Sequence, residues 1–130
     1  MTFKVDDTSA NTTPDKGAVA AHLAQMLAEQ EQHRIARRAA GLNALQRLVP
    51  IALGHTGQCR VVGRFLLGLY NGPQYRFDLT DLRLLDAPVH EDCLKVLMLD
   101  HSPEREVHEY VTDGHAKWQQ LISMWGRNDD

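Results

Sequence analysis

Apolar residues recur at helical spacing through the first third of the chain. Strong helix formers dominate residues 14–41, and four apolar residues share one face there: Val19, Leu23, Met26 and Leu27. Thr13-Pro14-Asp15 is typical of a helix start, because threonine can cap, proline fits the first turn and the acid opposes the positive helix end. Beyond Leu27 the stripe thins to Ile35. The pattern predicts a long helix over 14–41 whose second half is polar nearly all round, as in a projecting or partner-binding helix.

Shorter helices are predicted in the middle of the chain. Gly41 is expected to end the first helix, and the apolar face of 42–49 predicts a short core helix before Pro50. Thr56 can cap a third helix that stops at Asn71-Gly72-Pro73. Asp78-Leu79-Thr80-Asp81 resembles a capping box, which predicts a brief helix through Leu85.

The last third of the chain predicts at least two more helices. Asp86 and Pro88 open one that closes near Asp100, with an expected inner face of Val89, Cys93, Val96 and Leu97. Ser102-Pro103-Glu104 repeats the start signal, while residues 106–111 fit a helical turn or a short strand, with helix favoured. The final segment is the clearest amphipathic helix, on the positions Trp118, Leu121, Ile122 and Trp125.

Together these signals predict a mainly α protein. We expect a compact multi-helix domain of about five to seven helices with one long N-terminal helix. Residues 1–13 are small and polar and are expected to form a disordered tail, and 14–130 to form a single helical domain.

Composition fits an ordinary globular protein. The apolar share of 43% and charged share of 24% argue against wholesale disorder, and the longest apolar runs are far below the ~18 residues that cross a bilayer. The first residues carry acids where a signal peptide needs a basic and then an apolar region. We therefore expect a soluble, cytoplasmic protein.

A net charge of −3 gives the whole chain no attraction to phosphate backbones, so a nucleic-acid contact needs a local basic patch. Arg34, Arg37 and Arg38 form the one candidate, a helix face that can grip phosphates. Glu29 and Glu31 lie close by and no helix-turn-helix pattern follows. A solvated or protein-binding face is the favoured interpretation.

Candidate metal and catalytic groups do not form a recognised motif. His101, Glu104 and His108 approach one another only if a single helix spans them, which Pro103 opposes, and no HExxH or CxxC occurs. Cys59 and Cys93 lie among apolar neighbours and are interpreted as reduced thiols that fill the core. We therefore predict no metal, no cofactor and no catalytic residue.

Two further sets of residues are candidates for binding. Asp78 and Asp81, with Asp86, form an acidic cluster suited to a cation or a basic partner, although helix capping accounts for the first two. Trp125 is a candidate interface anchor, because tryptophan is enriched in binding hot spots. Its spacing of seven from Trp118 favours core packing for at least one of the two.

Several segments resemble a small uncharacterised bacterial family found mainly in plasmids, integrated elements and prophages. The likeness runs from about Leu45 to Gly126 and is carried by these stretches: Arg64-Phe65-Leu66-Leu67, Asn71-Gly72, Phe77-Asp78-Leu79-Thr80-Asp81-Leu82-Arg83, Leu85-Asp86, Asp92-Cys93-Leu94 and Glu106-Val107-His108-Glu109-Tyr110. The resemblance implies an origin in accessory DNA and a helical core over 42–126. It implies no mechanism.

These observations favour a non-enzymatic protein-interaction module. One concrete form is a stoichiometric inhibitor or modulator of a host defence complex, of the anti-CRISPR or anti-restriction type, which the resemblance to mobile-element proteins suggests. The alternative is a small nucleic-acid-binding regulator that uses the basic face of the first helix; a metal-dependent hydrolase around His101 and His108 is the third possibility. The first helix is also a candidate for pairing with a second copy of the chain.

Overall fold

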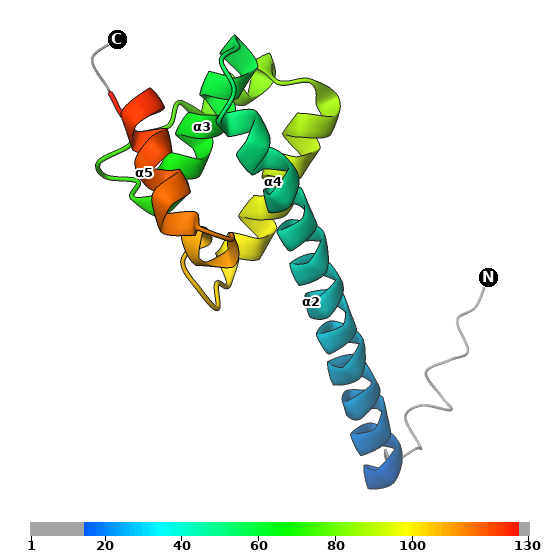
Figure 1. The fold of residues 1–130 in the computed structure, drawn as a ribbon. Helices are drawn as coiled ribbons and strands as arrows, with labels where there is room; N and C mark the ends of the chain where they lie inside the picture. The colour runs from blue at the N-terminus through cyan, green and yellow to red at the C-terminus, as the bar shows by residue number, and fades with distance from the viewer. Residues whose placement is uncertain (1–14, 128–130) are drawn as a thin grey trace, which may run out of the picture. The chain divides into compact units, whose positions relative to one another are not determined.

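A computed structural model describes residues 15–127 of the chain, and all of its regular structure there is helical. The elements follow the order α2 (Lys16–Ala52), α3 (Gly57–Tyr70), the 3-10 helix η1 (Leu79–Leu84), α4 (Ala87–His101), the 3-10 helix η2 (Val107–Tyr110) and α5 (Gly114–Trp125) (Figure 1). The predicted mainly α fold with one long N-terminal helix is confirmed. Residues 15–35 and 36–127 belong to two units, which are described separately.

The N-terminal unit is a solvent-exposed stretch of helix. The carboxylate of Asp15 accepts a hydrogen bond from the backbone N–H of Gly17 at 3.2 Å, which satisfies one unpaired donor at the start of α2. Every residue from 15 to 35 is exposed, including the apolar ones. The expected tail over 1–13 and the Thr13-Pro14 start signal lie outside the described residues.

Gly41 does not end the first helix, contrary to the sequence prediction, and the separate short helix over 42–49 is part of α2. A Cβ atom at Gly41 would lie 2.6 Å from the Cβ of Leu99 and 3.0 Å from the carbonyl oxygen of Lys95. The glycine is therefore required for the close approach of α2 to α4 rather than for a helix end. Pro50 lies in the last turns of α2, which ends at Ala52.

The core of the second unit is built around α3. This helix contacts α4, α5 and both 3-10 helices, and Figure 1 shows α3 and α5 next to each other. The C-terminal part of α2 contributes Ala44, Leu45, Leu48, Val49 and Ala52 to the same core. Apolar side chains from the four α-helices and from both 3-10 helices thus enclose one continuous interior.

Local capping signals place the middle helices as predicted. The hydroxyl of Thr56 accepts the Cys59 N–H at 3.2 Å at the start of α3, and Asn71 ends that helix. Asp86 precedes α4, with Pro88 in the first turn. The inner face of α4 differs from the predicted one at three positions, because Leu97 is 37% exposed while Asp92 and Leu99 are buried.

The segment between α4 and α5 resolves the alternatives for residues 106–111. Val107–Tyr110 is a 3-10 helix and not a strand. No helix begins at Ser102-Pro103-Glu104, so that start signal was misleading; residues 102–106 are irregular. The final helix α5 buries Trp118 and Leu121 as predicted, with Ile122 and Trp125 half-buried.

Candidate functional site

The three arginines predicted as a basic face have different environments. The Nε atom of Arg34 donates to both carboxylate oxygens of Glu31, at 3.0 and 3.1 Å. This hydrogen bonding from Arg34 lowers the pKa of Glu31 below its ordinary value. Arg37 is exposed. Arg38 belongs to the second unit and is engaged there.

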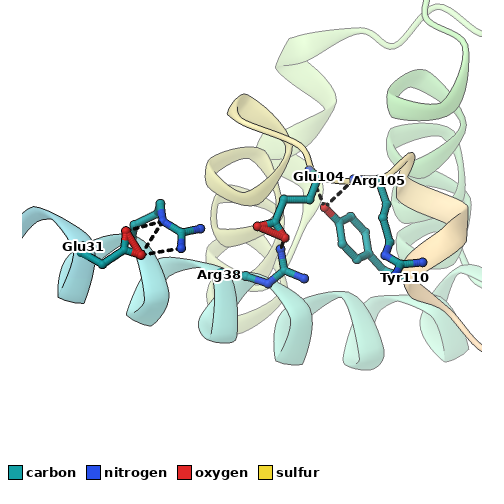
Figure 2. A network of polar contacts seen from close by, with 6 residues as sticks. Glu31, Arg38, Glu104, Arg105 and Tyr110 are labelled. Atoms are coloured by element: carbon teal, nitrogen blue, oxygen red, sulfur yellow. Dashed lines mark hydrogen bonds and ion pairs between the residues drawn. The ribbon is translucent and has the colours of Figure 1, made fainter.

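Arg38 forms the centre of a polar cluster with the segment after α4. Its guanidinium donates to the carboxylate of Glu104 and lies 5.8 Å from the centre of the Tyr110 ring (Figure 2). The Tyr110 hydroxyl accepts the backbone N–H groups of Glu104 and Arg105, at 3.1 and 3.2 Å. These contacts hold the irregular segment 102–106 against α2 and η2. We call Arg38, Glu104 and Tyr110 the Tyr110 cluster.

A second ion pair joins α2 to α4 and was not anticipated from the sequence. Arg47 donates through Nε and Nη2 to the two carboxylate oxygens of Asp92, at 2.9 and 2.8 Å. The Arg47 hydrogen bonds lower the pKa of Asp92 although its burial acts in the opposite direction. The sequence signal for this pair was the position of Asp92, which directly precedes Cys93. Cys93 was one of the residues expected on the inner face of α4.

The acidic cluster does not converge on one point. Asp78 accepts the backbone N–H of Thr80 at 3.0 Å and its hydroxyl at 2.8 Å, as the capping interpretation predicts. Those hydrogen bonds lower the pKa of Asp78. Asp81 is half-buried, and Asp86 bonds to Gln58 through its backbone N–H at 2.7 Å. The Asp86 carboxylate in turn accepts the side-chain amide of Gln58 at 3.4 Å.

Trp125 packs inside the second unit. Its indole N–H donates to the carbonyl oxygen of Ala52 at 2.8 Å, and its Cδ1 lies 2.2 Å from where a Cβ at Gly63 would stand. The indole of Trp118 is buried and donates to the carbonyl of Leu66 at 3.4 Å. Both indole rings thus pack in or against the core, with Trp118 buried and Trp125 half-buried.

No group of three or more His, Cys, Asp or Glu residues among 15–127 is arranged to hold a metal ion. His108 packs edge-on against Tyr70, with ring centres 5.2 Å apart, and its Nδ1 is buried without a hydrogen-bond partner. Burial raises the pKa of the Cys93 thiol to about 12, while Cys59 is half-buried and accepts the Thr56 hydroxyl at 3.0 Å.

The outer face of α4 carries an apolar surface that the sequence reading missed in part. Leu94, Leu97 and Met98 are 43%, 37% and 55% exposed. Their spacing of i, i+3 and i+4 puts them on one side of the helix. We call these three residues the α4 patch. Large apolar side chains that share one exposed face are a feature of protein-binding surfaces.

No described helix is long and apolar enough to cross a membrane. No curated protein and no solved structure shows a significant match to this chain. Residues 42–126, which hold most of the second unit, match a family described as a family of unknown function, DUF7673. Because this match covers well over half of the sequence, the chain belongs to that family.

Proposed function

We propose that this chain is a non-enzymatic protein-interaction module whose partner docks on the α4 patch. The observation that supports the proposal is the exposure of Leu94, Leu97 and Met98 on one helix face. Meanwhile Arg47 of α2 pairs with Asp92 of α4. A partner that offers apolar anchor residues would remove the three side chains from water, which is the main driving force of association.

The proposal is tested by capture of the partner from the natural host with three forms of the full chain. We expect the wild type to recover one protein at stoichiometric level. The double variant Leu94→Glu, Met98→Glu should lose it, because two charges would be buried without partners. The control Gln119→Glu, Gln120→Glu adds the same charge on exposed positions of α5 and should retain it.

The captured protein is then purified and titrated against the same three forms by calorimetry. Binding of the wild type and control with at least tenfold loss for the α4 variant supports the proposal. If the partner binds all three forms equally, or if no stoichiometric partner is recovered, the α4 patch is not the docking surface of a partner.

The form of interaction that we propose is stoichiometric inhibition or modulation of a host defence complex in the bacterial cytoplasm. Its support is the resemblance of residues 45–126 to proteins of plasmids and prophages, and not the geometry. In an assay of the partner's nuclease or interference activity, the effect should saturate at about one equivalent of this chain. A partner without defence activity would refute the proposed inhibition of a defence complex, but it would not contradict the proposal of a protein-interaction module.

Nucleic-acid binding is the less well supported alternative. Arg34 and Arg38 already bond to Glu31 and Glu104, which reduces the positive charge that this face offers to phosphates. A gel shift at two salt concentrations with the wild type and an Arg34→Ala, Arg38→Ala variant tests it. A salt-sensitive shift that the variant loses would favour this alternative.

A further inference from the structure

His108 places a titratable ring between two helices of the second unit. Its imidazole packs edge-on against Tyr70 of α3, with ring centres 5.2 Å apart, and lies 6.4 Å from the ring centre of Trp118 of α5. A Cβ atom at Gly114 would overlap the carbonyl oxygen of His108, so the backbone of η2 lies directly on the first residue of α5. The imidazole and the backbone of η2 are therefore held in one close contact with α3 and α5.

One nitrogen of this ring is buried without a partner. Nδ1 of His108 has no hydrogen bond, and within residues 15–127 no carboxylate forms an ion pair with the ring. A neutral imidazole leaves only a lone pair at Nδ1, whereas a protonated imidazole places an N–H group there. An aromatic ring is a much weaker acceptor for that N–H than an oxygen atom is. Protonation would therefore bury an unpaired donor on a charged ring, which is unfavourable.

The two helices packed on His108 supply no negative charge. Neither α3 nor α5 contains an Asp or Glu residue. The charged and titratable side chains of these helices are Cys59, Arg60, Arg64 and Tyr70 of α3 and His115 and Lys117 of α5. A proton on His108 thus adds to the positive charge of this region and neutralises no carboxylate of the two helices.

The acids of the segment around η2 have other roles. The Glu109 carboxylate accepts the backbone N–H of Glu106 at 2.8 Å, as part of a capping box. Glu106 lies near Asp100, and burial together with the Glu106 charge raises the pKa of Asp100. Asp113 is exposed and precedes α5. In the part of the chain that the structure describes, none of these carboxylates bonds to the imidazole.

From this arrangement we infer that His108 is an acid-sensitive contact that holds η2 on α3 and α5. The neutral ring stays packed between the two helices. In mild acid an imidazole takes up a proton, ordinarily near about pH 6.5, and the charged ring leaves this position for water. Undocking of η2 also loosens the irregular segment 102–106, because the Tyr110 hydroxyl accepts the backbone N–H groups of Glu104 and Arg105.

Two backbone amides report directly on this contact. The N–H groups of Val111 and Gly114 donate to the carbonyl oxygens of His108 and Val111, at 3.3 and 3.0 Å. Their protection factors are measured by NMR hydrogen exchange on the full chain at neutral pH and in mild acid, each corrected for intrinsic exchange. Between about pH 7 and about pH 5 we expect both factors to fall by about fivefold or more, with a ceiling of about thirtyfold for one imidazole.

Substitutions of two histidines separate this contact from general acid effects. His108→Gln removes the titrating ring and should make both protection factors nearly independent of pH over this range. The control His115→Gln removes an exposed histidine of α5 and should respond like the wild type. His108→Phe keeps an aromatic ring beside Tyr70 and Trp118, so it provides a second chain without proton uptake if His108→Gln fails to fold. Circular dichroism of each chain at both pH values reports whether it is folded.

The same measurements define the results that contradict the inference. Protection factors that do not change in the wild type between the two pH values would overturn it. An equal loss in the wild type and in the folded His108 variants would overturn it as well, because another group, such as Asp100, would then be responsible. The inference does not depend on the α4 patch, since substitutions at His108 leave the three residues of that patch unchanged.

Discussion

Asp92 shows how a single buried carboxylate is tolerated in this fold. Its side chain lies on the inner side of α4 beside Cys93, and Arg47 neutralises it through two hydrogen bonds from α2. Lys95 adds a weaker contact at 3.9 Å. A buried charge without such partners is strongly destabilising, so the pair acts as a specific link between the two helices.

We predict that Asp92→Asn lowers the free energy of unfolding at pH 7 by about 1–2 kcal/mol. This value is smaller than for a fully buried ion pair, because the Arg47 side chain is exposed and solvent screens its charge. The pKa of Asp92 is lower in the folded chain than in the unfolded one. Its contribution is therefore present above about pH 4 and is lost as the pH falls through the folded value. Urea unfolding of wild type and variant at pH 7 and about pH 3 should show the difference shrink in acid.

The neighbouring Glu91 provides the control for this experiment. It is exposed on the same helix, so Glu91→Gln removes one charge without removing the ion pair. We expect little change at either pH. If the difference between wild type and Asp92→Asn were the same in acid, the ionised pair would not be its cause.

The Tyr110 hydroxyl supports a further prediction at the scale of the residue. Tyr110→Phe keeps the ring beside Arg38 but removes the acceptor for two backbone N–H groups. We expect the amide hydrogens of Glu104 and Arg105 to exchange about fivefold faster or more, which corresponds to about 1 kcal/mol. Hydrogen exchange followed by NMR measures this directly.

Tyr75→Phe is the matched substitution elsewhere in the second unit, at a half-buried tyrosine. It should leave the two amides unchanged. Unaltered exchange in Tyr110→Phe would mean that segment 102–106 is held by other contacts, such as the pair between Arg38 and Glu104.

At the scale of the element, α2 is one helix with two different environments. Its residues 15–35 are exposed throughout, and its later residues supply part of the core. The change coincides with the first buried residue, Gly41, whose lack of a side chain permits contact with α4. Close helix packing at this point, and not helix propensity, determines which residue is accepted there.

The two glycines of α2 allow this to be tested with one substitution. Alanine favours a helix by about 1 kcal/mol over glycine, so propensity alone predicts that Gly17→Ala and Gly41→Ala both stabilise. Packing predicts that Gly41→Ala destabilises by about 1–3 kcal/mol, because its Cβ would overlap Leu99. At Gly17 the new Cβ meets only Asp15, at 3.6 Å. Thermal unfolding that ranked the two variants equally would contradict the packing argument.

At the scale of the whole molecule, local signals were readable from the sequence and distant contacts were not. The caps at Thr56 and Asp78 depend on residues within three positions, so their helices could be predicted. Gly41 was misinterpreted because glycine serves both helix ends and close packing. The pair between Arg47 and Asp92 joins residues 45 positions apart, and no local pattern indicates such a contact.

The same contrast between local signals and distant contacts applies to the candidate binding residues. Helical spacing identified the stripe from Val19 to Leu27, but it placed Leu97, which is 37% exposed, on the inner face of α4. Spacing shows which residues share a face of a helix. It does not show which faces the other helices cover, and that decides whether an apolar residue belongs to the core or to an interface.

If the exposed N-terminal unit contributes nothing to the core, then residues 36–130 should fold without it. We predict that this fragment unfolds with nearly the same midpoint as the full chain, because no residue from 15 to 35 is buried. In a Cys59→Ser background, Cys93 reports on the interior: its burial and its pKa of about 12 should keep it unreactive towards a thiol reagent near pH 8. The measurement is the rate of Cys93 labelling in the fragment and in the full chain. Rapid labelling in the fragment alone would mean that the core depends on the N-terminal unit, whereas equal protection would mean that the N-terminal unit does not stabilise the core.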